Sequence, residues 1–358
     1  MDDCFRQTDS PGPQLVKFLE TNCDKNHVTE EQMRPPTHVP AALIATAAAL
    51  LSNFVLAQET GDSYPTKPVR IVVPSAPGGA TDIQARLFAQ KLSEYMRGIF
   101  IIENRPGAGN TIGTSLVAKS APDGYTLLAL APGFTFSPAL YKNLPYDAEK
   151  DFAPISLMVR SPYLLAVHPS LPVTSVKDWI RLAKARPGQL NTGVAYGAFS
   201  HLATVWLLQS ANINVQIIPF KGVEPAVFGT MTGELQMVFG NVISVFPHVK
   251  HGKLKLLGSS VTSPSAALPN VPTIAEAIPG FELSSWHGWV APAGTPAVII
   301  NRISVGLARI SKLPEIVKVL QSDGGESVAG TPEQLRQLIS TEIGRWRKVV
   351  ATSNITVQ

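Results

Sequence analysis

The chain has 358 residues, of which 45% are apolar and only 16% are charged. A single hydrophobic core stops growing at about 250–300 residues, so this length predicts two domains. Soluble domains average about 25% charged residues, and nucleic-acid binders concentrate Lys and Arg, so the low charge argues against a nucleic-acid partner. The pI of about 9.0 attracts anions but defines no site.

An apolar segment near the N-terminus predicts that the protein is exported. Ala41–Leu51 is too short to span a bilayer, and Val55-Leu56-Ala57 after it has the small residues that signal peptidase prefers. We therefore expect residues 1–57 to be a leader that is cleaved after its last residue. Residues 1–32 are polar and acidic, which is unusual for a signal peptide, so Met33 is the expected start of translation. The alternative to a signal peptide is that the apolar segment Ala41–Leu51 forms a buried Ala-rich helix.

Both cysteines, Cys4 and Cys23, lie within this expected leader. The chain that remains would have no cysteine, which excludes disulfides, thiolate catalysis and cysteine-ligated metals. It would carry 26 basic and 19 acidic residues, a net charge of +7. No other stretch of it is long and apolar enough to cross a membrane.

Strands and helices then alternate along the chain. A β-branched run predicts a buried strand at Val69–Val73, and the spacing of apolar residues predicts a helix from Ala80 to Met96. The next elements are expected at 99–102 (strand), 111–119 (helix) and 125–131 (strand). This βαβαβ order implies a parallel sheet with crossover helices.

A second series of the same kind follows. It comprises strands at 163–168, 190–194, 215–220, 235–239 and 253–259, and helices at 176–185, 200–211 and 225–232. Three helices end the chain, each with Pro at its first position: 296–310, 314–321 and 332–351. Two similar α/β units without a flexible linker predict a clamshell whose chain crosses twice between the halves.

Two glycine-rich loops each join a strand to a helix in the first half. Pro74–Asp82 reads PSAPGGATD, and Glu103–Gly113 reads ENRPGAGNTIG. Glycine lets the backbone approach a ligand, and the N–H groups of a helix start favour an anion. Both loops should lie at the carboxyl edge of the sheet, where open α/β sheets bind ligands. The first loop alone could equally be a tight turn with a capping Asp, and it fits neither the Walker nor the dinucleotide pattern.

Together the motifs resemble a known family. The strings PSAPGGATD, ENRPGAGNTIG, PDGYTLL, LPYDAEKDFAPI, PNVPTIAEAIPGFE and WHGWVAPAGTP run in this order through nearly all of the chain after the leader. They are similar to the substrate-binding proteins of tripartite tricarboxylate transporters, the Bug family. The resemblance implies an α/β fold of periplasmic binding protein type II with a ligand cleft between two lobes. The expected lobes are residues 64–164 with 286–358, and residues 165–285.

The resemblance also implies a ligand and a partner. The ligand would be a tricarboxylate, dicarboxylate, acidic amino acid or aromatic carboxylate, and the partner a separate membrane permease. No cofactor, metal or catalytic residue is implied, and we expect a monomer. Ligand binding would favour a hinge motion that closes the lobes.

The loop that matches Pro74–Asp82 contributes backbone contacts to the ligand carboxylate in this family. Removing water from a carboxylate is costly, so several donors must replace its hydration shell. The expected ligand-binding residues are Ser75, Ala76, Gly78, Gly79, Ala80, Asp82, Thr135, Tyr196, Gly197, Ala198 and Asn241. For Asn241, closing a turn after its strand is the simpler alternative.

The second lobe departs from the family pattern. Ala195, Tyr196 and Ala198 stand where a glycine, an asparagine and a hydroxyl residue are usual. Phe220 replaces a usual Tyr, and residues 228–230 lack the usual acid. We therefore expect a less polar distal subsite, suited to an aromatic or short monocarboxylate. A cleft that had lost its function would show the same changes.

Other residues with a conceivable function have simpler explanations. Lys221 could pair with a carboxylate, but an exposed loop lysine is expected. His201 should start a helix rather than act as a base, because no Ser or Asp partner can be nominated. Trp286 and Trp289 are expected in the core rather than in the cleft. The remaining histidines considered do not form a metal set: His248, His251 and His287.

Two other functions stay open. A periplasmic enzyme acting on a carboxylate is disfavoured, because the sequence has no G-x-S-x-G elbow, no metal set and no paired cleft acids. A sensory protein that docks on a membrane sensor kinase would have an indistinguishable sequence.

Overall fold

The computed structural model describes residues 63–262, 268–322, 324–353 and 355. The expected leader, its cleavage site and both cysteines lie outside these residues. Within the described part of the chain, no helix combines the length and hydrophobicity that a bilayer crossing requires.

The first group of strands forms a mixed sheet. In spatial order its strands are β2 (Phe100–Asn104), β1 (Val69–Val73), β3 (Thr126–Leu130), β9 (Ser284–Pro292) and β4 (Phe152–Val167). β1 pairs in parallel with β2 and β3, which confirms the predicted βαβαβ unit. β9 is antiparallel to both β3 and β4. The short β10 (Glu326–Ser327) also pairs with β4.

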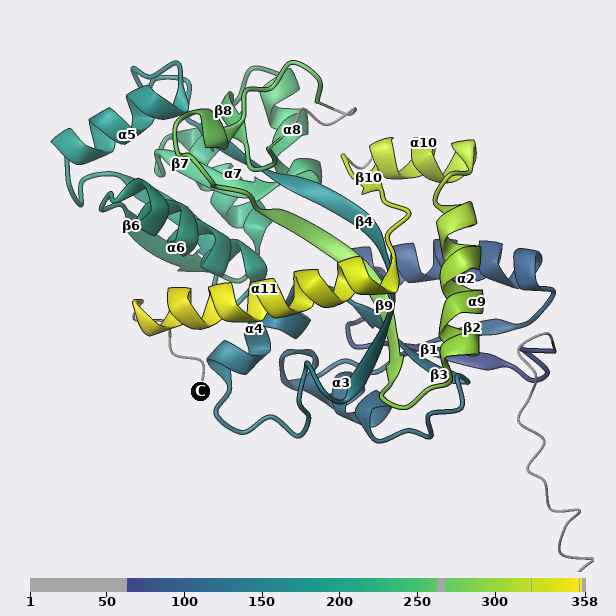
Figure 1. Ribbon diagram of the computed structural model, residues 1–358. Helices are drawn as coiled ribbons and strands as arrows, with labels where there is room; N and C mark the ends of the chain where they lie inside the picture. The colour runs from purple at the N-terminus through teal and green to yellow at the C-terminus, as the bar shows by residue number, and fades with distance from the viewer. Residues whose placement is uncertain (1–62, 263–267, 323, 354, 356–358) are drawn as a thin grey trace, which may run out of the picture. The chain divides into compact units, whose positions relative to one another are not determined.

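A second group of strands continues from the same β4. Its members are β8 (Lys255–Ser259), β7 (Met237–Asn241), β5 (Asn191–Ala195) and β6 (Gln216–Phe220). β5 is parallel to β6 and β7, whereas β7 and β8 flank β4 in antiparallel fashion. β4 pairs with β9 along Phe152–Pro162 and with β7 along Tyr163–Val167. The chain therefore leaves the first group along β4 and returns to it along β9 (Figure 1).

Helices cover both faces of the first group. One face packs against α2 (Ala80–Met96), α9 (Ala297–Ile310) and α10 (Pro314–Ser322). The other packs against α3 (Thr111–Ala118), α4 (Gly133–Leu140) and the long α11 (Pro332–Ala351). Alternate residues of β1 serve the two faces: Ile71 and Val73 lie in the first core, and Val72 lies in the second.

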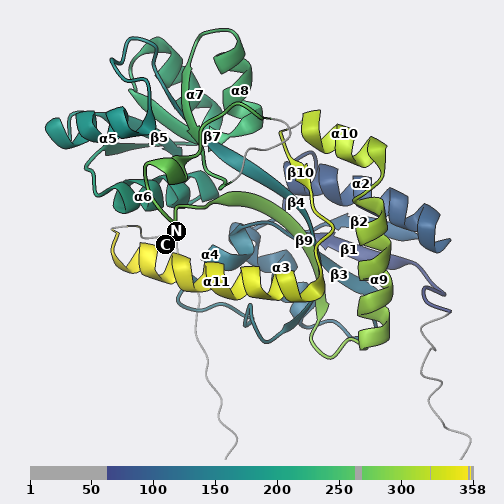
Figure 2. The same ribbon diagram turned by 45° about the horizontal axis from the view of Figure 1, so that its top comes forward.

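The second group is covered in the same way. The helices α5 (Val176–Ala185) and α6 (Phe199–Ala211) pack on one face, and α7 (Val223–Thr232) and α8 (Val242–Lys250) pack on the other. The C-terminal half of α11 contributes Trp346 and Val349 to the core beneath α6. Figure 2 shows α11 running from the first group of elements to α6. Two short 3₁₀ turns, Ala108–Asn110 and Ile274–Glu276, complete the elements.

The sequence predicted most helix limits, but three details were wrong. α4 and α8 were not predicted, since Pro138 and Pro247 lie inside them. β4 begins at Phe152 rather than near Tyr163. α9 begins at Ala297, so Pro296 precedes this helix instead of opening it.

Trp286 and Trp289 are almost fully buried, which confirms their predicted place in the core. The predicted division into lobes at residues 164 and 285 stays a prediction.

Candidate functional site

The carboxylate of Asp82 holds the loop between β1 and α2 in place through hydrogen bonds. This buried carboxylate accepts hydrogen bonds from the backbone N–H of Gly78 (2.9 Å), Nε of Arg86 (3.0 Å) and Nδ2 of Asn104 (2.9 Å). The Arg86 bond, helped by Gly78 and Asn104 and opposed by burial, lowers the pKa of Asp82 to about 2. Asp82 is therefore ionised and fully engaged by the protein, and its predicted contact with ligand stays a prediction.

The same loop also carries hydrogen-bonding groups that have no partner among the residues that the structure describes. The hydroxyl oxygen of Ser75 is buried and has no hydrogen bond among the described residues. Gly79 precedes α2 without capping it through a side chain, and the first N–H groups of a helix have no partner within the helix. Gly78 has a φ of +84°, a conformation that glycine adopts without strain. The loop is thus held by the bonds of Asp82, while the Ser75 hydroxyl and the N–H groups at the start of α2 remain free to bind a ligand.

The second glycine-rich loop lies against the first, as predicted. Val73 at the end of β1 is in register with Asn104 at the end of β2, and the N–H of Arg105 donates to the carbonyl of Val73 (2.8 Å). A Cβ on Gly113 would come within 3.0 Å of Cα of Pro74. Only glycine at position 113 permits this approach, which brings α3 against the start of the first loop.

Thr135, on α4 after β3, is fully buried and already bonded. Its hydroxyl lies 2.8 Å from Oε2 of Glu342 on α11 and 2.9 Å from the carbonyl of Pro132. Glu342 also accepts from Nε1 of Trp286 (2.9 Å). Burial raises the pKa of Glu342, although these donors and the nearby Arg345 oppose the rise. In this arrangement Thr135 ties α4 to α11, and its role in ligand binding stays a prediction.

The loop between β5 and α6 presents an aromatic pair. Tyr196 is 53% exposed, and its ring centroid lies 5.1 Å from that of His201. Nδ1 of the buried His201 accepts from the N–H of Gly197 (3.3 Å). Burial lowers the pKa of His201, so its ring is neutral at pH 7 and carries its proton on Nε2. His201 therefore offers a donor next to an exposed aromatic ring, in the first turn of α6.

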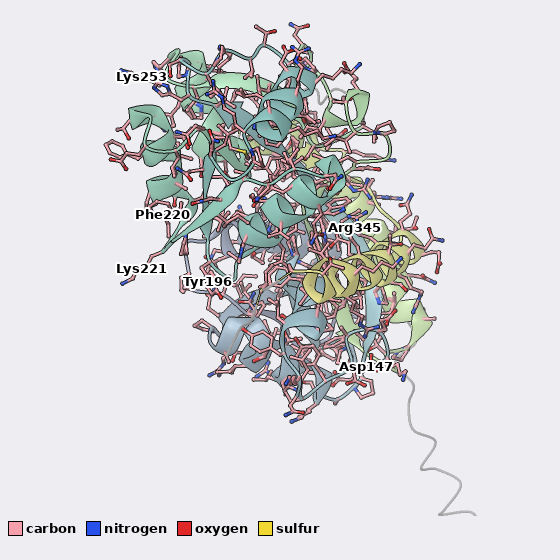
Figure 3. The ribbon with its side chains drawn as sticks, turned by 90° about the vertical axis from the view of Figure 1, so that its left-hand side faces the viewer. Asp147, Tyr196, Phe220, Lys221, Lys253 and Arg345 are labelled. Atoms are coloured by element: carbon pink, nitrogen blue, oxygen red, sulfur yellow. The ribbon has the colours of Figure 1, made fainter. Side chains whose placement is uncertain are left out.

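Lys221 and Asn241 lie at the ends of the strands next to β5. Lys221 is exposed, and Figure 3 shows it with Tyr196 and Phe220 along one margin of the molecule. The N–H of Tyr196 donates to the carbonyl of Phe220 (3.2 Å), which ties the two strand ends together. Asn241 caps α8, since its Oδ1 accepts from the N–H of Ser244 (2.9 Å). Asn241 thus caps a helix, which neither of the two predicted roles described, and a ligand contact through its amide nitrogen stays a prediction.

Several described helices that follow a strand begin without a side-chain cap, although α8, which follows β7, is capped by Asn241. The residues that precede α2, α4 and α6, which are Gly79, Pro132 and Ala198, make no side-chain capping bond. By contrast, Ser175 caps α5 and Thr331 caps α11. Side-chain capping normally satisfies these N–H groups. At α2 and α6 the uncapped start leaves N–H groups available to an anion, whereas at α4 the N–H groups of Phe134 and Thr135 already donate to the carbonyls of Ala131 and Pro132.

A comparison with family profiles gives a direct result. The profile described as "Tripartite tricarboxylate transporter family receptor" matches residues 84–355. The chain belongs to this family. Members of the tripartite tricarboxylate receptor family are periplasmic solute-binding proteins, as the sequence motifs predicted.

Individual relatives agree with this assignment. Protein BugT of Bordetella pertussis is 34% identical over 304 residues, which cover 83% of this chain and 92% of BugT. The structure of Rhodopseudomonas palustris Rpa4515 with adipate is 35% identical, with a TM-score of 0.68, over 82% of this chain and 99% of Rpa4515. MatC from R. palustris with bound malate is 30% identical, with a TM-score of 0.65, over 80% and 100% of the chains. The predicted periplasmic binding protein fold is confirmed.

Sequence reasoning missed three residues that shape the site. Arg86 lies four residues after Asp82, a helical spacing that already indicates an ion pair. Asn104 and Glu342 gave no such signal, because Asn104 reaches Asp82 from another strand and Glu342 reaches Thr135 across 207 residues of sequence.

Proposed function

We propose that this protein captures a small organic carboxylate in the periplasm and delivers it unchanged to the permease of a tripartite tricarboxylate transporter. The observation that carries the proposal is the Ser75–Ala80 loop, where a buried hydroxyl has no hydrogen bond to another described residue and the start of α2 has no side-chain cap. Adipate bound to Rpa4515 and malate bound to MatC support a carboxylate as the ligand. The family description supports the permease as the partner.

The proximal carboxylate of the ligand would bind above the loop. Desolvation of a carboxylate requires several donors, and the N–H groups at the start of α2 together with the Ser75 hydroxyl supply them. The negative charge of Asp82 does not oppose the ligand strongly, because Arg86 contacts both of its oxygens. The rest of the loop is held rigid before the ligand arrives, which lowers the entropic cost of binding.

The distal end of the ligand would meet the β5–α6 loop. Ala195 and Ala198 offer no hydroxyl group there, whereas Tyr196 offers an exposed aromatic ring and His201 a single N–H donor. These groups favour an aromatic or short monocarboxylate over a tricarboxylate, since a second carboxylate would find few donors.

A thermal-shift screen of several dozen carboxylates tests the proposal on the protein purified after expression of the full chain. A ligand at 100 times its dissociation constant adds about 2.7 kcal/mol to the free energy of unfolding. An aromatic or short monocarboxylate should give the largest shift. If a dicarboxylate or citrate gives the largest shift, the prediction of a less polar distal subsite is wrong, but the proposal that the protein carries a carboxylate still holds. If none of them stabilises the protein, the proposal fails.

Gly79→Val provides a matched variant for the loop. Gly79 has an ordinary extended backbone (φ −75°, ψ 163°), and a Cβ there would meet only the carbonyl oxygen of Ala76, at 3.6 Å. The variant should fold normally but fill the space above the loop, and lower ligand affinity at least about tenfold. Unchanged affinity would argue against this loop as the site. Recovery of the ligand unaltered, followed by NMR, separates carriage from catalysis.

A further inference from the structure

A pocket lies on the α11 side of the first sheet, where its lining residue Glu342 is bonded to Thr135. Its volume is about 320 Å³, and α11 forms one wall while β4 and the start of β9 form the other. The polar and charged residues that matter here are Arg160, Glu282, Ser284, Thr341, Glu342 and Arg345. None of the residues predicted to bind the transported ligand lines this pocket. Figure 3 shows Arg345, a residue of α11, apart from Tyr196 and Lys221.

Arg160 is directed into this pocket by the register of the sheet. It is paired with Trp286 across the β4–β9 ladder, and directly paired residues project to the same face. Nε1 of Trp286 donates to Glu342 of α11, so this face is the one that α11 covers. The half-buried side chain of Arg160 thus lies on the face of the sheet that α11 covers.

Arg160 is half-buried, and one buried nitrogen of its guanidinium, Nε, lacks a partner among the described residues. Arg160 also forms no ion pair with any other residue that the structure describes. A buried donor of a charged group that stays unsatisfied is costly. An oxygen atom of a ligand in the pocket would satisfy it.

Arg345, the other cation of the pocket, is already engaged. It lies 3.8 Å from Glu342, and its guanidinium stacks over the ring of Trp206 at 4.2 Å. The hydroxyl groups of Ser284 and Thr341 make no hydrogen bond to another described residue, so both are available. The pocket thus offers one unpaired cation and two hydroxyl donors.

We propose that this pocket binds a small monoanion with carboxylate-like oxygens, held by Arg160 and assisted by Ser284 and Thr341. Glu282 and Glu342 line the same pocket, and their charge would repel a dianion. Because α11 packs against both cores, an anion between α11 and β4 would add a link at the place where the chain passes from one sheet to the other.

Acetate is the probe, titrated by calorimetry in a buffer free of other carboxylates. The wild-type protein should show saturable binding, and Arg160→Gln should weaken it about tenfold or more, as expected for the loss of a hydrogen-bonded charge. Arg347→Gln is the matched control, because Arg347 is exposed on the same helix outside the pocket. Ser284→Ala should cause a smaller loss and tests the pocket without removing a charge.

The titration is repeated with Gly79→Val to separate the two sites. Acetate binding that survives Gly79→Val and disappears with Arg160→Gln supports the pocket, whether or not the Ser75–Ala80 loop binds the transported ligand. The inference is overturned if Arg160→Gln binds acetate as the wild type does, or if Gly79→Val alone abolishes the heat. It is also overturned if the wild type shows no binding at about 10 mM, where a site of 1 mM affinity is filled.

Discussion

Asp82 is the residue on which the shape of the candidate site depends most. Its carboxylate joins the Gly78 backbone, Arg86 of the same helix and Asn104 of the next strand. We predict that Asp82→Ala lowers the free energy of unfolding by about 2–3 kcal/mol, because three donors lose their acceptor in a partly buried place. Urea denaturation measures this change. Glu94→Ala, which breaks an exposed pair with Lys91, should cost less than about 1 kcal/mol.

The same variant should alter the acid dependence of stability. The pKa of Asp82 is lowered from 3.8 to about 2 in the folded protein, so its contribution is complete above pH 3.8 and is lost as the pH falls toward 2. The wild type should therefore lose more stability than Asp82→Ala across this interval. Parallel slopes for the two proteins would show that the carboxylate does not stabilise the loop.

Glu342 has the opposite titration behaviour. Burial raises its pKa above 4.5, so the folded state binds the proton more tightly than the unfolded state does. Stability from this group is complete below pH 4.5 and is lost as the pH rises through the folded pKa. Glu342→Gln keeps an oxygen to accept from Thr135 and Trp286 but buries no charge.

We therefore predict that Glu342→Gln is more stable than the wild type at pH 8, by about 1 kcal/mol. The difference should shrink at pH 4, where Glu342 is protonated in both states. Denaturant titrations at the two pH values give both numbers. A variant that is less stable at pH 8 would mean that Arg345 and the hydrogen bonds outweigh desolvation.

At the scale of elements, α11 contributes to a core on each side, as the shorter α4 also does. Its N-terminal half buries Leu335 and Ile339 against the first sheet, and Trp346 lies fully buried against α6. The Trp346 ring meets Phe199 edge-on at 5.7 Å and Trp206 at 6.1 Å.

Truncation of Trp346 should be among the costliest single changes in this helix. We predict that Trp346→Ala lowers the free energy of unfolding by about 3–5 kcal/mol, because it opens a large cavity in an aromatic cluster. Arg347→Ala, one position along but exposed, should change it by less than about 0.5 kcal/mol. Urea unfolding compares the two, and similar losses would contradict the packing described here.

The elements that sequence predicted well are those with a strong local pattern. α2, α5 and α11 match their predicted limits, because apolar spacing marks all three and a capping residue also precedes α5 and α11. The first part of β4 was missed, since Pro154 and Pro162 are unusual in a central strand. For the site, the glycine loops were predictable from composition, whereas the bonds of Asp82 to Asn104 and of Thr135 to Glu342 depend on how distant segments meet.

At the scale of the described molecule, two sheets share the strand β4, and the helices α11 and α4 each contribute to both cores. β4 pairs with β9 in the first group and with β7 and β8 in the second, and α11 contributes to a core on each side. Neither sheet can lose its part of β4 without exposing the backbone of that strand. This sharing predicts that the sheets unfold together, even if they move as two lobes when a ligand binds.

Hydrogen exchange with mass spectrometry at increasing urea concentrations tests this prediction. Peptides that contain β1 report on the first sheet and peptides that contain β5 on the second, and both should lose protection at the same urea concentration. Trp346→Ala should lower both midpoints together, because the helix it weakens serves both cores. Earlier loss of protection in β5 would instead mean that the second sheet is an independent folding unit, and that β4 and α11 connect the two sheets without coupling their stability.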